Sequence, residues 1–209
     1  MTATLDERPR HYRCRVSSRP RSATPSSGPC GTTCSPGGRR SRRTKRKGCA
    51  RPRSKIHGRN YAPLLALHWG LTLTVTGLLG LDLLPSFVFF RLFFEGDVLR
   101  VHSDRPACEV SLSLTLASSD SLPWPLSVGT APANESRGVE DDFGNEPYDS
   151  FAMNAGDGLL YRGTERRHGR LEPNPNRWSA HVFFMWVHAA GEHRNEAFER
   201  LDLGAAPSF

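Results

Sequence analysis

A histidine and an aspartate separated by one residue, His102 and Asp104, stand at the end of the apolar run "VLRVH". A non-haem ferrous site takes two imidazoles and one carboxylate on one face of the metal and leaves the other positions open. Two such ligands, one at the end of a strand and one in the turn beyond it, can reach the same ion. The pair alone is weak evidence for a metal site, because motifs this short also arise by chance.

The second imidazole of such a site must come from another part of the chain. His168, in "GDGLLYRGTERRHGR", is the preferred candidate, with His181 and His188 as alternatives. His181 lies inside a predicted strand and His188 at its far end, where a histidine is usually just buried or exposed. His168 is therefore the best candidate for a third ligand beside His102 and Asp104.

An arginine near these ligands could hold a carboxylate. Arg177, nine residues after His168, opens the predicted strand "RWSAHVFFMWV", and a guanidinium there could bind a carboxylate through two parallel hydrogen bonds. Arg162 and Arg170 are the alternatives. Because Arg170 is only two residues from His168, its side chain could face the same way and touch a substrate. Arg177 is the first candidate for a carboxylate-binding residue.

The elements that must position these residues are short strands. From Pro85 onward apolar runs alternate with turn residues, and "CEVSLSLTLA" alternates strictly between apolar and polar residues. Many short strands at regular spacing predict a sandwich or barrel, a group that includes the double-sheet jelly roll. Tyr161 and Trp124 are candidates to line a pocket, although aromatic residues in strands more often belong to the core. The expected strands are 86–94, 98–102, 108–117, 124–128, 150–153, 158–162 and 178–187.

The first 59 residues differ from the rest of the chain in charge and composition. They carry 17 Lys and Arg against 2 Asp and Glu, whereas the remainder carries 11 against 19. Rich in Arg, Pro, Ser and Gly, they hold too few apolar residues to offset the entropy of ordering. We therefore predict a disordered basic arm over 1–59 and a domain over 60–205. The arm is also the only part where net charge favours nucleic acid as a partner.

Four of the five cysteines lie in this arm, and their spacing lacks the paired short knuckles of a zinc ribbon. No disulfide framework is implied, which fits a reducing compartment. These four residues are Cys14, Cys30, Cys34 and Cys49.

The segment 62–81, "APLLALHWGLTLTVTGLLGL", is apolar and has no formally charged side chain. Its length equals that of a membrane span, and the basic residues before it would place the arm in the cytoplasm. The alternation from Leu71 to Thr76 favours a strand instead. We expect a cytoplasmic protein for which a membrane is not a partner, with a membrane anchor at 62–81 as the alternative.

Taken together and in this order, the motifs resemble those of Fe(II)/2-oxoglutarate-dependent dioxygenases of the prolyl-4-hydroxylase-like branch. "FFEGDVLRVHSD" resembles the run in which a glycine precedes the first iron-binding histidine by six residues. "GDGLLYRG" resembles the strand before the distal histidine, and "RWSAHVFF" the strand that binds the far carboxylate of 2-oxoglutarate. "LLPSFVFFRLFFEGDVLRVHSDRPACEVSLSLTL" and "PWPL" are also similar to small bacterial-type oxygenases. The resemblance covers roughly 60–200.

This resemblance implies a mainly β fold, a double-stranded β-helix (jelly roll) with a few flanking helices. It implies Fe(II) held by His102, Asp104 and His168, with 2-oxoglutarate bound by Arg177 and Tyr161 in the cofactor pocket. Dioxygen would be the cosubstrate, and ascorbate is a further candidate cofactor. The implied reaction couples decarboxylation of 2-oxoglutarate to hydroxylation of a C–H bond in a peptide or small molecule, with the protein orienting the reactants.

Three positions depart from the branch's pattern. Leu99 stands where a tyrosine is frequent, the spacing from His168 to Arg177 is nine residues rather than ten, and Gly169 replaces an aromatic residue. These departures leave open an oxygenase fold without turnover. The basic arm and the apolar segment 62–81 leave open a second class, a membrane-anchored or nucleic-acid-associated binding protein.

Overall fold

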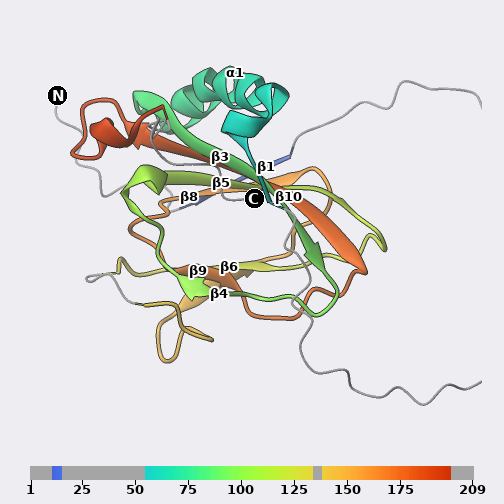
Figure 1. Cartoon of the computed structure of the whole chain (residues 1–209). Coiled ribbons are helices and arrows are strands. Elements are labelled where there is room, and N and C mark those ends of the chain that lie inside the picture. Colours follow the sequence, from blue (N-terminus) through green and yellow to red (C-terminus); the bar gives the residue numbers. More distant parts are fainter. Residues whose placement is uncertain (1–10, 16–54, 134–137, 199–209) are drawn as a thin grey trace, which may run out of the picture. The chain divides into compact units, whose positions relative to one another are not determined.

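The structure is a computed structural model of the chain, and it describes residues 11–15, 55–133 and 138–198. These residues belong to one compact unit, Met1–Val16 with Arg53–Phe209. Two antiparallel sheets lie face to face, and a helix covers the outer side of the larger sheet (Figure 1). The predicted fold class, a mainly β jelly roll, is confirmed.

The larger sheet has six strands and the smaller has four. The six-stranded sheet runs, in spatial order, β1 (His11–Arg15), β8 (Asp157–Tyr161), β5 (Val110–Ser118), β10 (Trp178–His188), β3 (Leu83–Phe94) and β2 (Lys55–His57). The four-stranded sheet runs β4 (Leu99–His102), β9 (His168–Arg170), β6 (Leu126–Gly129) and β7 (Tyr148–Phe151). The helix is α1 (Ala62–Leu79), and 3-10 turns are η1 (Gly58–Asn60), η2 (Pro106–Cys108) and η3 (Arg194–Glu196).

The two faces of the six-stranded sheet have different partners because side chains alternate along each strand. On the outer face, Val88, Phe184 and Trp186 form a core cluster with Leu64 and Val75 of α1. On the inner face, a second cluster joins Phe87, Phe93, Phe183 and Met185 of β3 and β10 with residues from the loops. The cavity described below lies on this inner side.

Residues 62–79 form a helix, so the strand expected there is wrong. Pro63 occupies the first turn, and Gly80 ends the helix in the left-handed conformation, its N–H donating to the Thr76 carbonyl oxygen. The helix buries Leu64, His68 and Val75, which share one face at helical spacing. The helical pattern was hard to recognise because one of its buried residues is His68. The alternation of Leu and Thr from Leu71 to Thr76 repeats every two residues, as in a strand, although the segment is helical.

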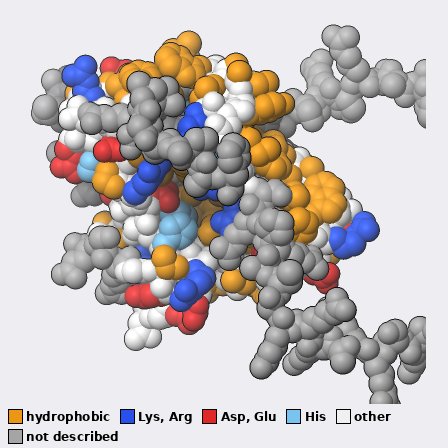
Figure 2. All heavy atoms as spheres, in the orientation of Figure 1, with side chains coloured by type: hydrophobic (Ala, Val, Ile, Leu, Met, Phe, Trp, Pro, Cys, Tyr) orange, Lys and Arg blue, Asp and Glu red, His pale blue; other side chains and the backbone are white. Residues whose placement is uncertain are grey.

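Two hydrogen bonds attach α1 to the central strand. His68 Nε2 donates to the Met185 carbonyl oxygen at 2.9 Å, and Trp186 Nε1 donates to Thr72 Oγ1 at 2.9 Å. Hydrophobic side chains nevertheless gather on the outer side of the helix (Figure 2). Of the described residues, α1 alone is long and apolar enough to cross a membrane by length and composition, with a mean hydropathy of 1.4. One such helix is weak evidence for a span.

Two short strands lie within the range predicted to be disordered. His11–Arg15 pairs with β8 as an edge strand, and Lys55–His57 pairs with β3. The six-stranded sheet therefore extends beyond the expected boundary at residue 60. Most of the basic arm, with Cys30, Cys34 and Cys49, lies outside the described residues.

Candidate metal centre

Strand pairing brings the three predicted metal ligands together. His102 ends β4 and lies opposite His168 of β9, and Asp104 follows two residues after His102. Asp104 Oδ1 is 3.7 Å from His102 Nε2 and 3.6 Å from His168 Nε2. Ligand atoms about 2.1 Å from an ion are about 3 Å apart when they are neighbours around it. Small side-chain shifts would therefore close these three atoms around a metal.

Backbone carbonyl groups orient both imidazoles. His102 Nδ1 donates to the Arg100 carbonyl oxygen at 2.7 Å, and His168 Nδ1 donates to the Arg166 carbonyl oxygen at 2.9 Å. Each ring thereby keeps its Nε2 lone pair for a metal, as ligating histidines do. Burial lowers the pKa of His168, with Asp104 acting in the opposite direction and His102 lowering it further. The neutral ring is the form that coordinates a metal.

The Asp104 carboxylate is held by its surroundings. Ser111 Oγ, on β5, donates to Asp104 Oδ2 at 2.9 Å, which leaves Oδ1 facing the two histidines. The Asp104 N–H donates to the Gly163 carbonyl oxygen at 2.8 Å. A Cβ on Gly163 would lie closer than 3.0 Å to Asp104 Oδ2, the Cys108 carbonyl oxygen and Ser111 Oγ. The glycine of the "YRG" motif is therefore required by the packing of the carboxylate.

Two of the departures from the family pattern have a local explanation. A Cβ on Gly169 would lie 2.7 Å from the Leu99 carbonyl oxygen and 3.1 Å from Val101 Cα, so a larger residue does not fit this backbone. Leu99 lines the cavity beside the triad. Leu99 therefore faces the cavity, as a tyrosine at this position would, but it offers an apolar contact in place of the tyrosine hydroxyl group.

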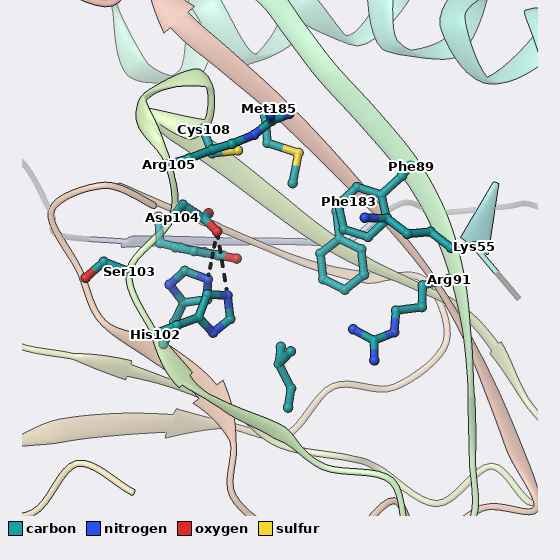
Figure 3. Close-up of a pocket in the computed structure, with 13 residues that line it drawn as sticks. Lys55, Phe89, Arg91, His102, Ser103, Asp104, Arg105, Cys108, Phe183 and Met185 are labelled. Carbon is teal, nitrogen blue, oxygen red and sulfur yellow. Dashed lines mark ion pairs between the residues drawn. The ribbon is translucent and has the colours of Figure 1, made fainter. Parts of the chain in front are cut away.

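The triad opens onto a cavity of about 320 Å³ between the sheets. Figure 3 shows His102 and Asp104 on one side of it and Phe89, Phe183, Lys55 and Arg91 on the other. The His102 side chain is 24% exposed, and histidine side chains are visible at the surface in Figure 2. The lining residues are Lys55, Phe89, Arg91, Leu99, His102, Ser103, Asp104, Arg105, Cys108, Tyr161, His168, Phe183 and Met185.

Arg177 is not brought to the triad. Its side chain is 75% exposed and its Nε lies 3.3 Å from Asp120 Oδ1 at the molecular surface. The residue directly precedes β10, and its backbone N–H also donates to Asp120 Oδ2. Arg177 therefore lies at the start of the expected strand, but its side chain is at the surface, where it pairs with Asp120.

Two other arginines lie at the inner end of the barrel. Arg91 lines the cavity from β3, next to Lys55 of β2 and His181 of β10 in the strand register. Arg170, two residues after His168, is fully buried, and its Nη2 lies 3.4 Å from His181 Nδ1. Sequence reasoning did not select Arg91. The sequence did contain an indication: Arg91 lies two residues after Phe89 in the apolar run "SFVFFRLFF", so the two side chains face the same side of the sheet.

Arg170 is an unusual buried cation. It donates from Nη1 to the Trp124 carbonyl oxygen and its guanidinium lies 4.7 Å from the Trp124 ring centroid. Its Nε has no hydrogen-bond partner, and no described carboxylate forms an ion pair with it. Burial lowers the pKa of Arg170 to about 9. A buried guanidinium without a carboxylate leaves a positive potential at this end of the barrel.

Tyr161 and Trp124, the two aromatic candidates, have different positions. Tyr161 lines the cavity, and its ring centroid is 4.5 Å from that of His168. Burial raises the pKa of Tyr161 well above its usual value, with the Asp104 charge acting in the same direction. Trp124 is buried in the core beside Phe93 and does not line the cavity.

The alternative histidines do not join the triad. His181 is fully buried on the inner face of β10, 3.3 Å from Thr115 Oγ1, and His188 lies at the end of the strand. Within the described ranges, His102, Asp104 and His168 form the one group of potential metal ligands, with ligand atoms within 4.8 Å of one another. Two imidazoles and one carboxylate on one side of a cavity fit a divalent iron with open positions.

The fold is similar to that of two solved Streptomyces proteins. AviO1 from Streptomyces viridochromogenes Tue57 has a TM-score of 0.51 and 17% identity, over 69% of this chain and 72% of that chain. HygX from Streptomyces hygroscopicus, with nickel and 2-oxoglutarate bound, has a TM-score of 0.50 and 12% identity, over 69% and 73%. No protein-family model and no curated protein sequence matches the chain. At these identities the likeness shows the fold alone.

Proposed function

We propose that this protein is an Fe(II)- and 2-oxoglutarate-dependent dioxygenase, a hydroxylase of the prolyl-4-hydroxylase-like branch. The observation that carries the proposal is the convergence of His102, Asp104 and His168 on one point at the wall of a cavity. The fold supports it, since the similar HygX structure holds nickel and 2-oxoglutarate. When bound, Fe(II) would supply the site at which 2-oxoglutarate and dioxygen react.

The chain's own residues would prepare that site. His102 and His168 present their Nε2 atoms because backbone carbonyls hold their Nδ1–H groups. Ser111 keeps the Asp104 carboxylate turned toward the histidines. The rings of Phe89 and Phe183, stacked with centroids 4.8 Å apart, form an apolar wall opposite the triad. Such a wall limits water around the reacting groups.

We assign the far carboxylate of 2-oxoglutarate to Arg91 rather than Arg177. Arg91 lines the cavity, whereas Arg177 is paired with Asp120 at the surface. The buried charge of Arg170 near His181 adds to the positive potential at the same end. Tyr161, which also lines the cavity, would contact the cosubstrate or its metal-bound end.

The test is succinate formation from 2-oxoglutarate under air, with anaerobic Fe(II) binding measured by calorimetry on the same preparations. We expect the wild-type protein to bind Fe(II) and form succinate. His102→Ala and Asp104→Ala should lose both, because two ligands remain of three. His188→Ala, a histidine of the same barrel outside the triad, is the matched control and should retain both. A wild-type protein that binds no Fe(II) would exclude the proposal.

We also propose a cytoplasmic location without a membrane span. The hydrogen bonds from α1 to β10 support this, because a spanning helix would have to leave the sheet on which it packs. Carbonate extraction of membranes tests it. Release of the protein into the supernatant is the expected result, and retention in the pellet would favour the membrane-anchor alternative.

A further inference from the structure

Two cations from distant parts of the chain lie over neighbouring rings of β3, whose centroids are 5.5 Å apart, and one of these rings, Phe89, lines the cavity. Lys55 Nζ, from β2, is 4.1 Å from the Phe89 ring centroid and 5.8 Å from that of Phe87. Arg105, in the turn after the triad, places its guanidinium carbon 4.5 Å from the Phe87 centroid. Both side chains line the cavity and are exposed at its mouth. The aromatic faces therefore position positive charge beside the apolar wall.

More cationic than anionic side chains line the cavity. Among the described residues, the cationic ones that line the cavity are Lys55, Arg91 and Arg105, and the anionic one is Asp104. The proposed function assigns Asp104 to the metal and Arg91 to the cosubstrate. It assigns Lys55 and Arg105 to neither ligand.

We propose that Lys55 and Arg105 bind the anionic group of the substrate, and that its apolar body packs on Phe89 and Phe183, the two aromatic rings that line the cavity beside them. The inference rests on the proposed function, because it takes the second molecule in the cavity to be the substrate. The substrate class is a small amphipathic anion with a carboxylate, sulfonate or phosphate group. The cavity of about 320 Å³ is shared with the cosubstrate and lies at the lower end of the ~300–1,000 Å³ range of small-molecule sites, so the body of the substrate must be small.

Electrostatics disfavours the other charge classes. A cationic ligand would meet Lys55 and Arg105 at the mouth, and like charges repel most where an apolar wall keeps water away. A neutral ligand would gain only from contact with the rings. An anion would gain from both, and its affinity should fall with ionic strength because the two cations are exposed.

The experiment measures the binding of a matched set of probes to the protein loaded anaerobically with Fe(II) and saturating 2-oxoglutarate. The probes are 2-naphthoate, its neutral amide 2-naphthamide and the cation 2-naphthylmethylammonium, followed by calorimetry. We expect 2-naphthoate to bind about tenfold more tightly than the amide and the cation to bind most weakly. In the same assay, 2-naphthalenesulfonate and 2-naphthyl phosphate rank the anionic groups.

Substitutions of the two cations test whether they cause the preference for the anionic probe. Lys55→Met and Arg105→Met each keep an apolar stem, and each should weaken 2-naphthoate about threefold, as exposed charge pairs do. The double variant should lose the preference for the anion while keeping its affinity for the amide. Arg59→Met removes an exposed cation of η1 that does not line the cavity, so it should change nothing.

Three results would overturn the inference. The first is equal affinity for the anion, amide and cation. The second is an unchanged anion preference in the double variant. The third is competition between 2-naphthoate and 2-oxoglutarate, which would place the anion in the cosubstrate's position. If the protein fails to bind Fe(II) or 2-oxoglutarate but the unloaded protein keeps the anion preference, the proposed function alone fails.

Discussion

The outer and inner faces of the six-stranded sheet are built from the same strands but do different things. On the outer face Val88, Phe184 and Trp186 pack under α1 without a charged residue. On the inner face, Arg91 and His181 occupy paired positions on β3 and β10. One face supplies the apolar burial that stabilises the domain, and the other carries the polar groups of the candidate site.

The buried polar residues of the inner face lower the stability of the folded protein unless they form hydrogen bonds. Buried polar groups lose their water and must find partners. Ser111 bonds to Asp104 and Thr115 to His181, whereas Ser113 Oγ has no hydrogen-bond partner. The apolar burial on the outer face offsets this cost. Substitutions on the outer face should therefore change stability, and substitutions on the inner face should change ligand binding.

The largest effect is expected for Phe184→Ala on the outer face. Phe184 is fully buried in the cluster beneath α1, so its truncation should destabilise the protein by about 3–5 kcal/mol. Urea denaturation measures this loss, with Leu116→Ala, an exposed residue of β5, as the control. The Fe(II) affinity of the folded protein should not change. A parallel loss of metal binding would show that the faces are coupled.

His68 makes the stability of the outer face depend on pH. Burial lowers its pKa from 6.5 to about 4. The unfolded chain therefore binds the proton more readily, so this contribution is complete above pH 6.5 and is lost as the pH falls toward 4. The shift corresponds to about 3 kcal/mol. His68→Gln, which can still donate to the Met185 carbonyl oxygen, should remove this part of the acid sensitivity in denaturation curves recorded from pH 7 to 4.

On the inner face, Ser111→Ala should affect metal binding more than folding. Loss of its hydrogen bond frees the Asp104 carboxylate to turn, and such supporting contacts are typically worth ~10–100-fold in metal affinity. Ser113→Ala is the matched control, two residues away on the same strand and the same face. It should leave Fe(II) affinity unchanged. Equal effects of the two substitutions would contradict a positioning role for Ser111.

The smallest effect is expected for Arg177→Ala. Its ion pair with Asp120 is exposed, so both the stability and the KM for 2-oxoglutarate should stay nearly unchanged. Arg91→Ala is the contrast and should raise that KM by about tenfold or more, as loss of a charge-assisted contact does. A KM that rises for Arg177→Ala and not for Arg91→Ala would return the cosubstrate role to Arg177.

Local patterns predicted much of the fold, and the family resemblance carried by the ordered motifs predicted the triad. The seven expected strands all correspond to strands of the structure, and His168 is the histidine that meets His102 and Asp104. Strand alternation and ordered motifs are local, so one sequence reveals them. The helix at 62–79 was missed because its Leu–Thr alternation mimics a strand, and β9 was missed because three residues carry no period.

The sequence by itself determined the strands, the ligand types and their order along the chain, because these depend on side-chain chemistry and short spacings. The tertiary structure alone decided which cation faces the cavity. Asp120 lies 57 residues from Arg177 and holds it at the surface, while strand pairing sets Arg91 beside Lys55 and His181. Contacts between distant segments have no local pattern, so the choice between two arginines depended on how the sheets pair and close.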